Sequence, residues 1–404
     1  MQTPARYKAV AELLETIFNS PAPADNIIGE YFRNRRYIGS KDRKFIGDTT
    51  WNIIRHWRRL SFEAQSQEIR KIMLVYLREE NLSEIFSGNE YAMETITEEE
   101  QIWLKNLPQT PYPYAVEAEC PDWIYEKFDD FSLFKSLSTT STADFRINKA
   151  NREYVINKLE TEGISVVPTP LSPIGIRAQN RINLNNCQTF LEGYIEPQDE
   201  ASQLTAILAD IKAEEKTVDY CCGAGGKSLA IGALLQNKGK IEAHDINTRR
   251  MEPMFERMKR LQINNIFSVK TADISSDYDN FILDAPCSGS GTWRRSPDSK
   301  FKLTPQKLQE LTEIQQNLLN LASEKVKING KIIYITCSVL PCENNLQIER
   351  FLSEHKNFIA TDLKKIWQQK IADVFPFDSN NCLQFSPLST GTDGMFIAVL
   401  QKIA

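Results

Sequence analysis

Residues 219–228 read DYCCGAGGKS, and this stretch decides the fold. It lies between a β-type run that starts at residue 217 and an apolar segment typical of a helix. Glycines in such a turn let backbone amides approach a ligand, and the N-terminus of the following helix favours negative charge. The stretch therefore predicts the first strand–turn–helix unit of an open α/β sheet, with a ligand bound at the rim of the sheet.

The residues that follow repeat this alternation of strand and helix. After the first strand, at 217–221, further strands are expected at 240–245, 267–270, 280–283 and 331–336, with a late strand at 395–400. Thr304-Pro305 marks a helix start, because Thr suits the N-cap and Pro the first helical position. From about residue 201 onward, the predicted fold class is therefore α/β with a parallel, doubly wound sheet.

The turn itself is compatible with more than one ligand. It is not a phosphate-binding P-loop, because Cys221 stands where that motif needs glycine. It is not a dinucleotide fingerprint either, because Ser228 stands where that motif needs glycine. S-adenosylmethionine remains, since its ribose needs an acidic partner at the end of the second strand, where Asp245 lies. The same acidic residue also serves NAD, and a purely structural tight turn is a further alternative.

Two cysteines suggest the chemistry. Cys287 in DAPCSG and Cys337 in TCS each follow a short apolar run, at 281–283 and 331–335. Parallel strands leave their carboxyl ends at one rim of the sheet, so the two thiols should converge. A pair of cysteines beside a glycine-rich turn suggests covalent chemistry on an electrophilic ring carbon.

Bulk composition sets the class of protein. At 404 residues, with 41% hydrophobic and 25% charged residues, the chain should form two or three globular domains. No apolar run approaches membrane-spanning length, and the first residues lack the pattern of a signal or transit peptide. The eight cysteines form neither a disulfide framework nor a Cys-x-x-Cys zinc pair. The three histidines show no ligand or triad spacing and are expected to be incidental. We therefore expect a cytoplasmic protein without metal.

Three segments follow one another along the chain. Residues 1–135 show helical periodicity, and a Pro/Tyr-rich linker at 107–113 interrupts them. Residues 136–200 contain short mixed elements that predict a small α+β domain of ferredoxin or RRM type. Residues 201–404 form the α/β domain described above.

The charge distribution has two interpretations. A net charge of −5 argues mildly against a nucleic-acid partner. Residues 30–60, however, carry only Glu30, Asp42 and Asp48 as acids, against Arg33, Arg35, Arg36, Lys41, Arg43, Lys44, Arg55, Arg58 and Arg59. This run is either a solvated basic helix face or a surface that contacts RNA.

Four longer motifs carry a resemblance to a known family. They are QDEASQ at 198–203, DAPCSGSGTWRRSPD at 284–298, TCSVLP at 336–341 and GTDGMF at 391–396. From about residue 140 to 404 the chain resembles the Sun/RsmB family of RNA cytosine-5 methyltransferases. The first segment resembles the NusB-like RNA-binding domain of the bacterial ribosomal-RNA members. The resemblance implies a Rossmann-like class I methyltransferase domain.

The resemblance also implies residue roles. Cys337 would be the nucleophile, Cys287 would assist release, and Asp284 would lie by the reacting methyl group and the cytosine edge. Asp245 would hold the ribose and Asp273 would lie near the adenine. The methionine part of the cofactor would be cradled by Cys221, Cys222, Gly223, Ala224, Gly225, Gly226 and Lys227. The family usually has alanine and proline where this chain has Gly223 and Ala224, which loosens the turn.

The function expected from this resemblance is S-adenosylmethionine-dependent methylation of carbon 5 of a cytosine in RNA, with 16S ribosomal RNA favoured and transfer RNA possible. We expect a monomer with no membrane partner. The alternatives are an RNA-binding ribosome assembly factor that has lost catalysis, and a methyltransferase of proteins or small molecules. Intact Asp245, Asp284, Cys287 and Cys337 argue against lost catalysis.

Overall fold

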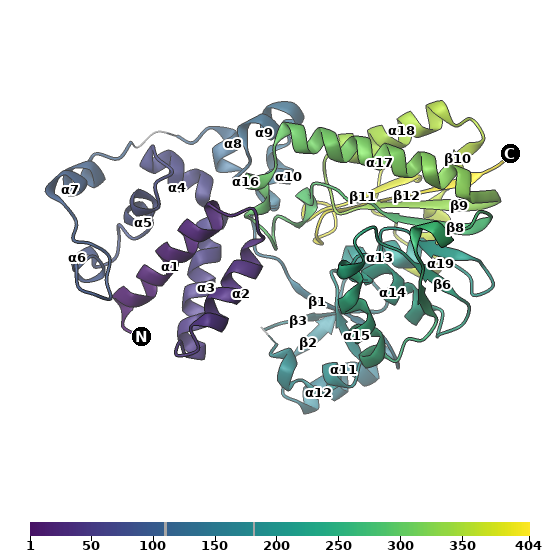
Figure 1. Ribbon diagram of the computed structural model, residues 1–404, viewed down its shortest axis with the longest axis horizontal. Helices are drawn as coiled ribbons and strands as arrows, with labels where there is room; N and C mark the ends of the chain where they lie inside the picture. Colours follow the sequence, from purple (N-terminus) through teal and green to yellow (C-terminus); the bar gives the residue numbers. More distant parts are fainter. Residues whose placement is uncertain (109–110, 181) are drawn as a thin grey trace. The chain divides into compact units, whose positions relative to one another are not determined.

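The computed structural model describes residues 1–108, 111–180 and 182–404. These residues form two compact units (Figure 1): Met1–Thr140 with Thr292–Pro305, and Ser141–Gly291 with Gln306–Ala404. The expected linker at 107–113 includes Gln109 and Thr110, which lie outside the described residues. None of the helices in the described ranges is long and apolar enough to cross a membrane.

The first unit is all-helical, as predicted. Its core consists of apolar side chains that recur at helical spacing, such as Val10, Leu13 and Ile17, which are fully buried. Its helices are α1 (Thr3–Phe18), α2 (Ala24–Asn34), α3 (Ser40–Arg55), α4 (Trp57–Ala64), α5 (Ile69–Tyr76), α6 (Leu82–Ile85), α7 (Glu98–Lys105), α8 (Tyr114–Glu117), α9 (Asp122–Phe128), α10 (Phe131–Ser136) and α16 (Ser299–Lys302).

The segment Thr292–Pro305 packs within this helical unit, although its first residues, to Asp298, belong to the motif that contains Cys287. Trp293 is 1% exposed and stacks on Phe134, with 6.1 Å between ring centroids. The Lys300 ammonium group donates to the Glu119 carbonyl at 3.0 Å. Both side chains thus contact residues of the N-terminal segment Met1–Thr140. The domain boundaries 1–135, 136–200 and 201–404 stay predictions.

The second unit begins with the small antiparallel sheet that the α+β prediction requires. Its strand order is β2-β3-β1-β4. The core beside this sheet includes Phe145, Val155 and Leu159. The elements are β1 (Ala143–Ile147), α11 (Arg152–Thr161), β2 (Val166–Pro168), β3 (Gly175–Ala178), α12 (Gln188–Leu191) and β4 (Ile195–Pro197).

The large sheet of the second unit has the strand order β10-β12-β9-β8-β5-β6-β7, with β11 paired to β12. The five strands β5 to β9 run parallel to one another, as predicted. They are β5 (Thr217–Asp219), β6 (Ile241–Ala243), β7 (Ile266–Ser268), β8 (Tyr278–Asp284) and β9 (Val326–Thr336). The remaining strands are β10 (Phe358–Ala360), β11 (Cys382–Phe385) and β12 (Met395–Lys402).

The prediction of an all-parallel sheet is wrong for its last strands. β12 runs antiparallel to β9, β10 and β11. Only residues 386–394 join β11 to β12. So short a connection reverses the chain, whereas parallel neighbours need a crossover of about a dozen residues or more. The sheet is therefore mixed.

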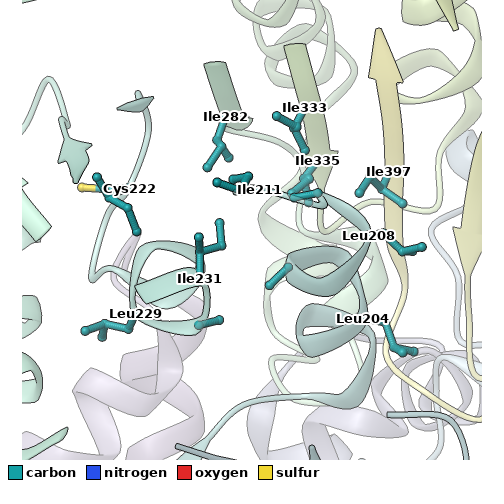
Figure 2. Packing of buried hydrophobic residues seen from close by; sticks show 14 of the residues in the cluster. Leu204, Leu208, Ile211, Cys222, Leu229, Ile231, Ile282, Ile333, Ile335 and Ile397 are labelled. Atoms are coloured by element: carbon teal, nitrogen blue, oxygen red, sulfur yellow. The ribbon is translucent and has the colours of Figure 1, made fainter. Parts of the chain in front are cut away.

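Helices cover both faces of this sheet, so it is doubly wound (Figure 1). Ile282 of β8 packs on one face, with α13 (Glu200–Leu208), α14 (Gly226–Leu234) and α19 (Leu363–Lys370), as part of the cluster in Figure 2. Its neighbours Phe281 and Leu283 pack on the opposite face, with α17 (Pro305–Lys325) and α18 (Asn345–Glu354). Each fully buried side chain of this size stabilises the fold by about 1.5–3 kcal/mol, which holds the strand ends, and the residues just beyond them, in place.

Candidate active site

The glycine-rich turn joins β5 to α14 and needs its glycines for two different reasons. Gly223 and Gly225 have positive φ angles of 51° and 79°, which other residues rarely adopt. A Cβ on Gly225 would also lie 2.3 Å from Cγ of Met254. A Cβ on Gly226, by contrast, would meet no atom within 4 Å. Space is therefore open at the start of α14, where the sequence predicts a ligand.

Asp245 lies just beyond β6 and is hydrogen-bonded to this turn. Its Oδ2 accepts from the backbone N–H of Gly223 at 3.0 Å, and its Oδ1 accepts from that of Asn247 at 2.9 Å. The exposed Arg250 approaches Oδ2 to 3.2 Å. The carboxylate is thus held at the tip of the turn, and the structure brings together the acid and the turn that the sequence paired.

His244 is part of the same arrangement, although its spacing in the sequence predicts no functional role. Its buried ring has Nδ1 2.8 Å from the Tyr220 carbonyl and Nε2 2.8 Å from the Thr271 hydroxyl. Because a carbonyl only accepts, Nδ1 is the donor in the first bond. His244 therefore ties the glycine-rich turn to the end of β7. The available signal was its position next to Asp245 at a strand end.

Asp284, at the end of β8, faces a buried cation. The Lys227 Nζ lies 3.4 Å from Asp284 Oδ2 and donates to the Ser202 hydroxyl at 2.9 Å. The Gln198 amide donates to Ser202 and to the carbonyl of Gly226. The QDEASQ motif thus lies against the turn and orients Lys227 toward Asp284.

Asp219, the last residue of β5, is a second carboxyl group in this region. It is fully buried and accepts a hydrogen bond from Ser228 at 2.5 Å. Burial raises the pKa of Asp219 from 3.8 to about 7, and the nearby charge of Asp284 adds to the increase. Its burial and its bond to Ser228 indicate that Asp219 stabilises the turn.

The two thiols converge, which confirms the geometric prediction. Asp284 of β8 pairs with Ile335 of β9, so both strands end at the same level. Cys337 comes directly after β9, and Cys287 lies three residues beyond β8. Their Sγ atoms are 3.3 Å apart. The hydrogen bond between them and then burial raise the pKa of Cys287 well above its usual value.

The other predicted residues occupy the same rim. Asp273 is exposed, in the turn Thr271–Asp273 that holds His244 through Thr271. Burial raises the pKa of Cys221 and Cys222, which keeps both as neutral thiols. Ala224 accepts a hydrogen bond from Arg257 through its carbonyl. Within the described ranges, no group of three or more potential ligands could hold a metal ion.

Glu343 is a buried acid near the two thiols that no motif in the sequence predicted. Glu343, a few residues after Cys337, is 0% exposed and accepts hydrogen bonds from both Ser288 and Ser338. An acidic residue six positions after Cys337 was the only signal in the sequence.

Comparison with known proteins places this arrangement in context. The family model described as 16S rRNA methyltransferase RsmB/F matches residues 206–401. A probable ribosomal RNA small subunit methyltransferase B of Bacillus subtilis is 30% identical over 306 residues, which are 71% of this chain and 67% of that protein. A similar protein of Synechocystis is 30% identical over 314 residues, 73% of this chain and 70% of that one. The fold matches the crystal structure of PH0851 with a TM-score of 0.78 at 23% identity, over 100% of this chain and 99% of that one.

Proposed function

Because the chain belongs to the RsmB/F family of rRNA methyltransferases, we propose that it methylates carbon 5 of a cytosine in 16S ribosomal RNA through a covalent cysteine adduct. The family is S-adenosylmethionine-dependent, which agrees with the interpretation of the glycine-rich turn. One observation carries the proposal. Two thiols 3.3 Å apart lie at the ends of adjacent strands, beyond the carboxyl group of Asp284.

The residues at the rim fit the cofactor. Gly226 leaves open space at the start of α14, and the Asp245 carboxylate is held at Gly223 of the same turn. Asp245 would accept hydrogen bonds from the ribose hydroxyls, residues 221–227 would hold the methionine part, and Asp273 would lie near the adenine. When bound, S-adenosylmethionine supplies an electrophilic methyl group.

Cys337 would start the reaction on the base. Carbon 5 of cytosine is too weak a nucleophile to take a methyl group unaided. Addition of the Cys337 thiolate at carbon 6 makes carbon 5 electron-rich. Asp284, as a carboxylic acid, would donate a hydrogen bond to ring nitrogen 3 and stabilise the negative charge that develops there. The target cytosine must be unpaired or flipped out to reach these groups.

Release requires the carbon 5 proton to pass to solvent water. The electron pair of that C–H bond re-forms the ring double bond and expels the Cys337 sulfur from carbon 6 as a thiolate. The raised pKa of Cys287 keeps it a thiol, which can donate a hydrogen bond to the departing Cys337 sulfur. The two cysteines would therefore have different tasks, with Cys337 attacking and Cys287 assisting release.

Single replacements of the two cysteines test this division. Cys337→Ala should abolish both methylation and the covalent RNA adduct. Cys287→Ala should allow addition and methyl transfer but slow release, so that a ribonuclease-sensitive adduct accumulates on a denaturing gel. The double variant should form no adduct.

Two outcomes would contradict the mechanism. An adduct trapped by Cys337→Ala and not by Cys287→Ala would reverse the roles, and normal methylation by both variants would exclude covalent catalysis. Bisulfite sequencing of total RNA from cells with and without the gene tests the substrate. If the cytosine that becomes sensitive to bisulfite conversion in cells without the gene lies in transfer RNA instead of 16S rRNA, the choice of substrate is wrong.

A further inference from the structure

One buried carboxylate touches the neighbours of both thiols. Glu343 ends the short helical turn Pro341–Glu343 and is fully buried. Its Oε2 accepts from the hydroxyls of Ser288 and Ser338, each at 2.5 Å. Its Oε1 accepts from the backbone N–H of Ser288 at 2.8 Å and from the Gln315 amide at 3.0 Å.

The donors to Glu343 come from the loops that carry the two cysteines. Ser288 directly follows Cys287, and Ser338 directly follows Cys337. Gln315, on α17, also donates to the carbonyl of Pro286, on the other side of Cys287. The carboxylate therefore connects the loop after β8 with the loop after β9, and α17 holds both to the body of the unit.

The four hydrogen bonds use the full acceptor capacity of a carboxylate. Such saturation is what a buried acid requires, since desolvation of a charged group is costly unless it is fully hydrogen-bonded. A second tie, from Asn344 to Thr336 and Ser338, holds the Cys337 loop alone. Ser290 and Gly291 of the Cys287 loop also bond the Cys337 loop directly. Glu343 adds a tie that spans both loops and joins them to α17 through Gln315.

We propose that Glu343 is a positioning residue that holds the Cys287 and Cys337 loops together, so that the two sulfurs stay in contact. Its consequence for catalysis rests on the function proposed above, but its effect on thiol geometry does not. The carboxylate itself bonds the serines and not the sulfurs. Its charge also adds to the raised pKa of Cys287, after the Cys337 hydrogen bond and burial.

The test measures thiol proximity in the full-length protein without RNA. Diamide takes two electrons and two protons from a pair of thiols and leaves a disulfide. Peptide mass spectrometry then follows the Cys287–Cys337 disulfide over time. The Glu343→Gln variant should form it at least about 10-fold more slowly than the wild type, because an amide cannot accept all four bonds. Glu349→Gln, the same change at an exposed position of α18, should match the wild type.

Two further variants distinguish the positioning role of Glu343 from a general loss of structure. Glu343→Asp keeps the carboxylate on a shorter side chain and should recover part of the rate. Ser288→Ala leaves Glu343 in place but removes one hydroxyl tie to the Cys287 loop, and should give an intermediate rate if Glu343→Gln does not fold. A disulfide rate in Glu343→Gln or Ser288→Ala equal to that of the wild type would overturn the proposal.

Methylation kinetics separate this inference from the proposed function. In Glu343→Gln, kcat should fall at least about 10-fold while KM for S-adenosylmethionine stays within about 2-fold, since the cofactor turn is not touched. If the wild type methylates no RNA but the disulfide rates differ, the proposed function fails and the positioning role stands. If methylation proceeds and the rates are equal, the positioning role fails alone.

Discussion

At the scale of single residues, Asp219 makes stability depend on pH. Its pKa is raised in the folded protein from 3.8 to about 7 by burial and by Asp284. Between pH 4 and pH 7, Asp219 is ionised in the unfolded state but still protonated in the folded state. Its contribution to the free energy of unfolding is therefore greatest below pH 4 and is lost as the pH rises to about 7. Asp219→Asn should remove this loss.

The expected gain of Asp219→Asn over the wild type is therefore pH-dependent. It should grow by about 2–4 kcal/mol in the free energy of unfolding between pH 4 and pH 8. Denaturant unfolding at several pH values measures it, and Asp277→Asn, at an exposed acid, is the matched control. A constant difference across this range would show that Asp219 does not titrate there.

A second residue-scale prediction concerns Asp245. Charge-assisted bonds to two ribose hydroxyls are worth about 1.5–3 kcal/mol, so Asp245→Ala should weaken S-adenosylmethionine binding about 10- to 100-fold. Arg250→Ala should not weaken binding, because Arg250 only pairs with the same carboxylate. Calorimetry measures both constants, with circular dichroism to check the fold. Unchanged affinity in Asp245→Ala would remove this residue from the site.

At the scale of one element, the turn before α14 distinguishes two adjacent glycines. Gly225→Ala should destabilise the protein by about 1–3 kcal/mol, because alanine is strained at φ 79° and its Cβ would collide with Met254. Gly226→Ala should be neutral or slightly stabilising, since the position is open and alanine favours the helix. Denaturant unfolding without cofactor measures both. Equal effects would contradict the turn geometry.

At the scale of the whole molecule, the basic stretch divides into two groups. Within the helical unit, Arg58 pairs with Asp122, and Arg59 donates to the buried Glu119 at 2.7 Å. Arg55 donates to two carbonyls, of Thr139 and Arg294. The exposed basic side chains are those of Arg33, Arg36, Lys41 and Lys44. Charges already used to hold the unit together are poor candidates for RNA phosphates.

The two groups should therefore respond differently to neutral replacement. Changing Arg33, Arg36, Lys41 and Lys44 to Gln should weaken RNA binding and flatten its salt dependence by up to about 3 in the slope of log K against log salt. Changing Arg58 and Arg59 to Gln should instead lower stability, because the buried Glu119 would lose its ion pair with Arg59 and Asp122 its ion pair with Arg58. Filter binding at several salt concentrations and thermal unfolding separate the effects. An unchanged slope in the first variant would mean that this face is only solvated.

The pattern of the chain was sufficient for much of the fold and of the candidate site. Strand–helix alternation predicted the central parallel strands. The rule that such strands end at one rim predicted that Cys287 and Cys337 lie close together, as they do. Asp245 and the turn were paired for the same reason. These features are local in sequence, or depend only on the order of elements, so periodicity and motif position are enough to predict them.

Other features were decided by tertiary contacts alone. The antiparallel direction of β12, the burial of Trp293 among N-terminal helices, and the role of Glu343 between two loops all depend on which distant segments meet. A buried acid or tryptophan looks the same in the sequence whichever partners it finds, because burial and hydrogen bonding are properties of the packed chain. The sequence thus determined the chemistry available at the rim, while packing decided which side chains hold it in place.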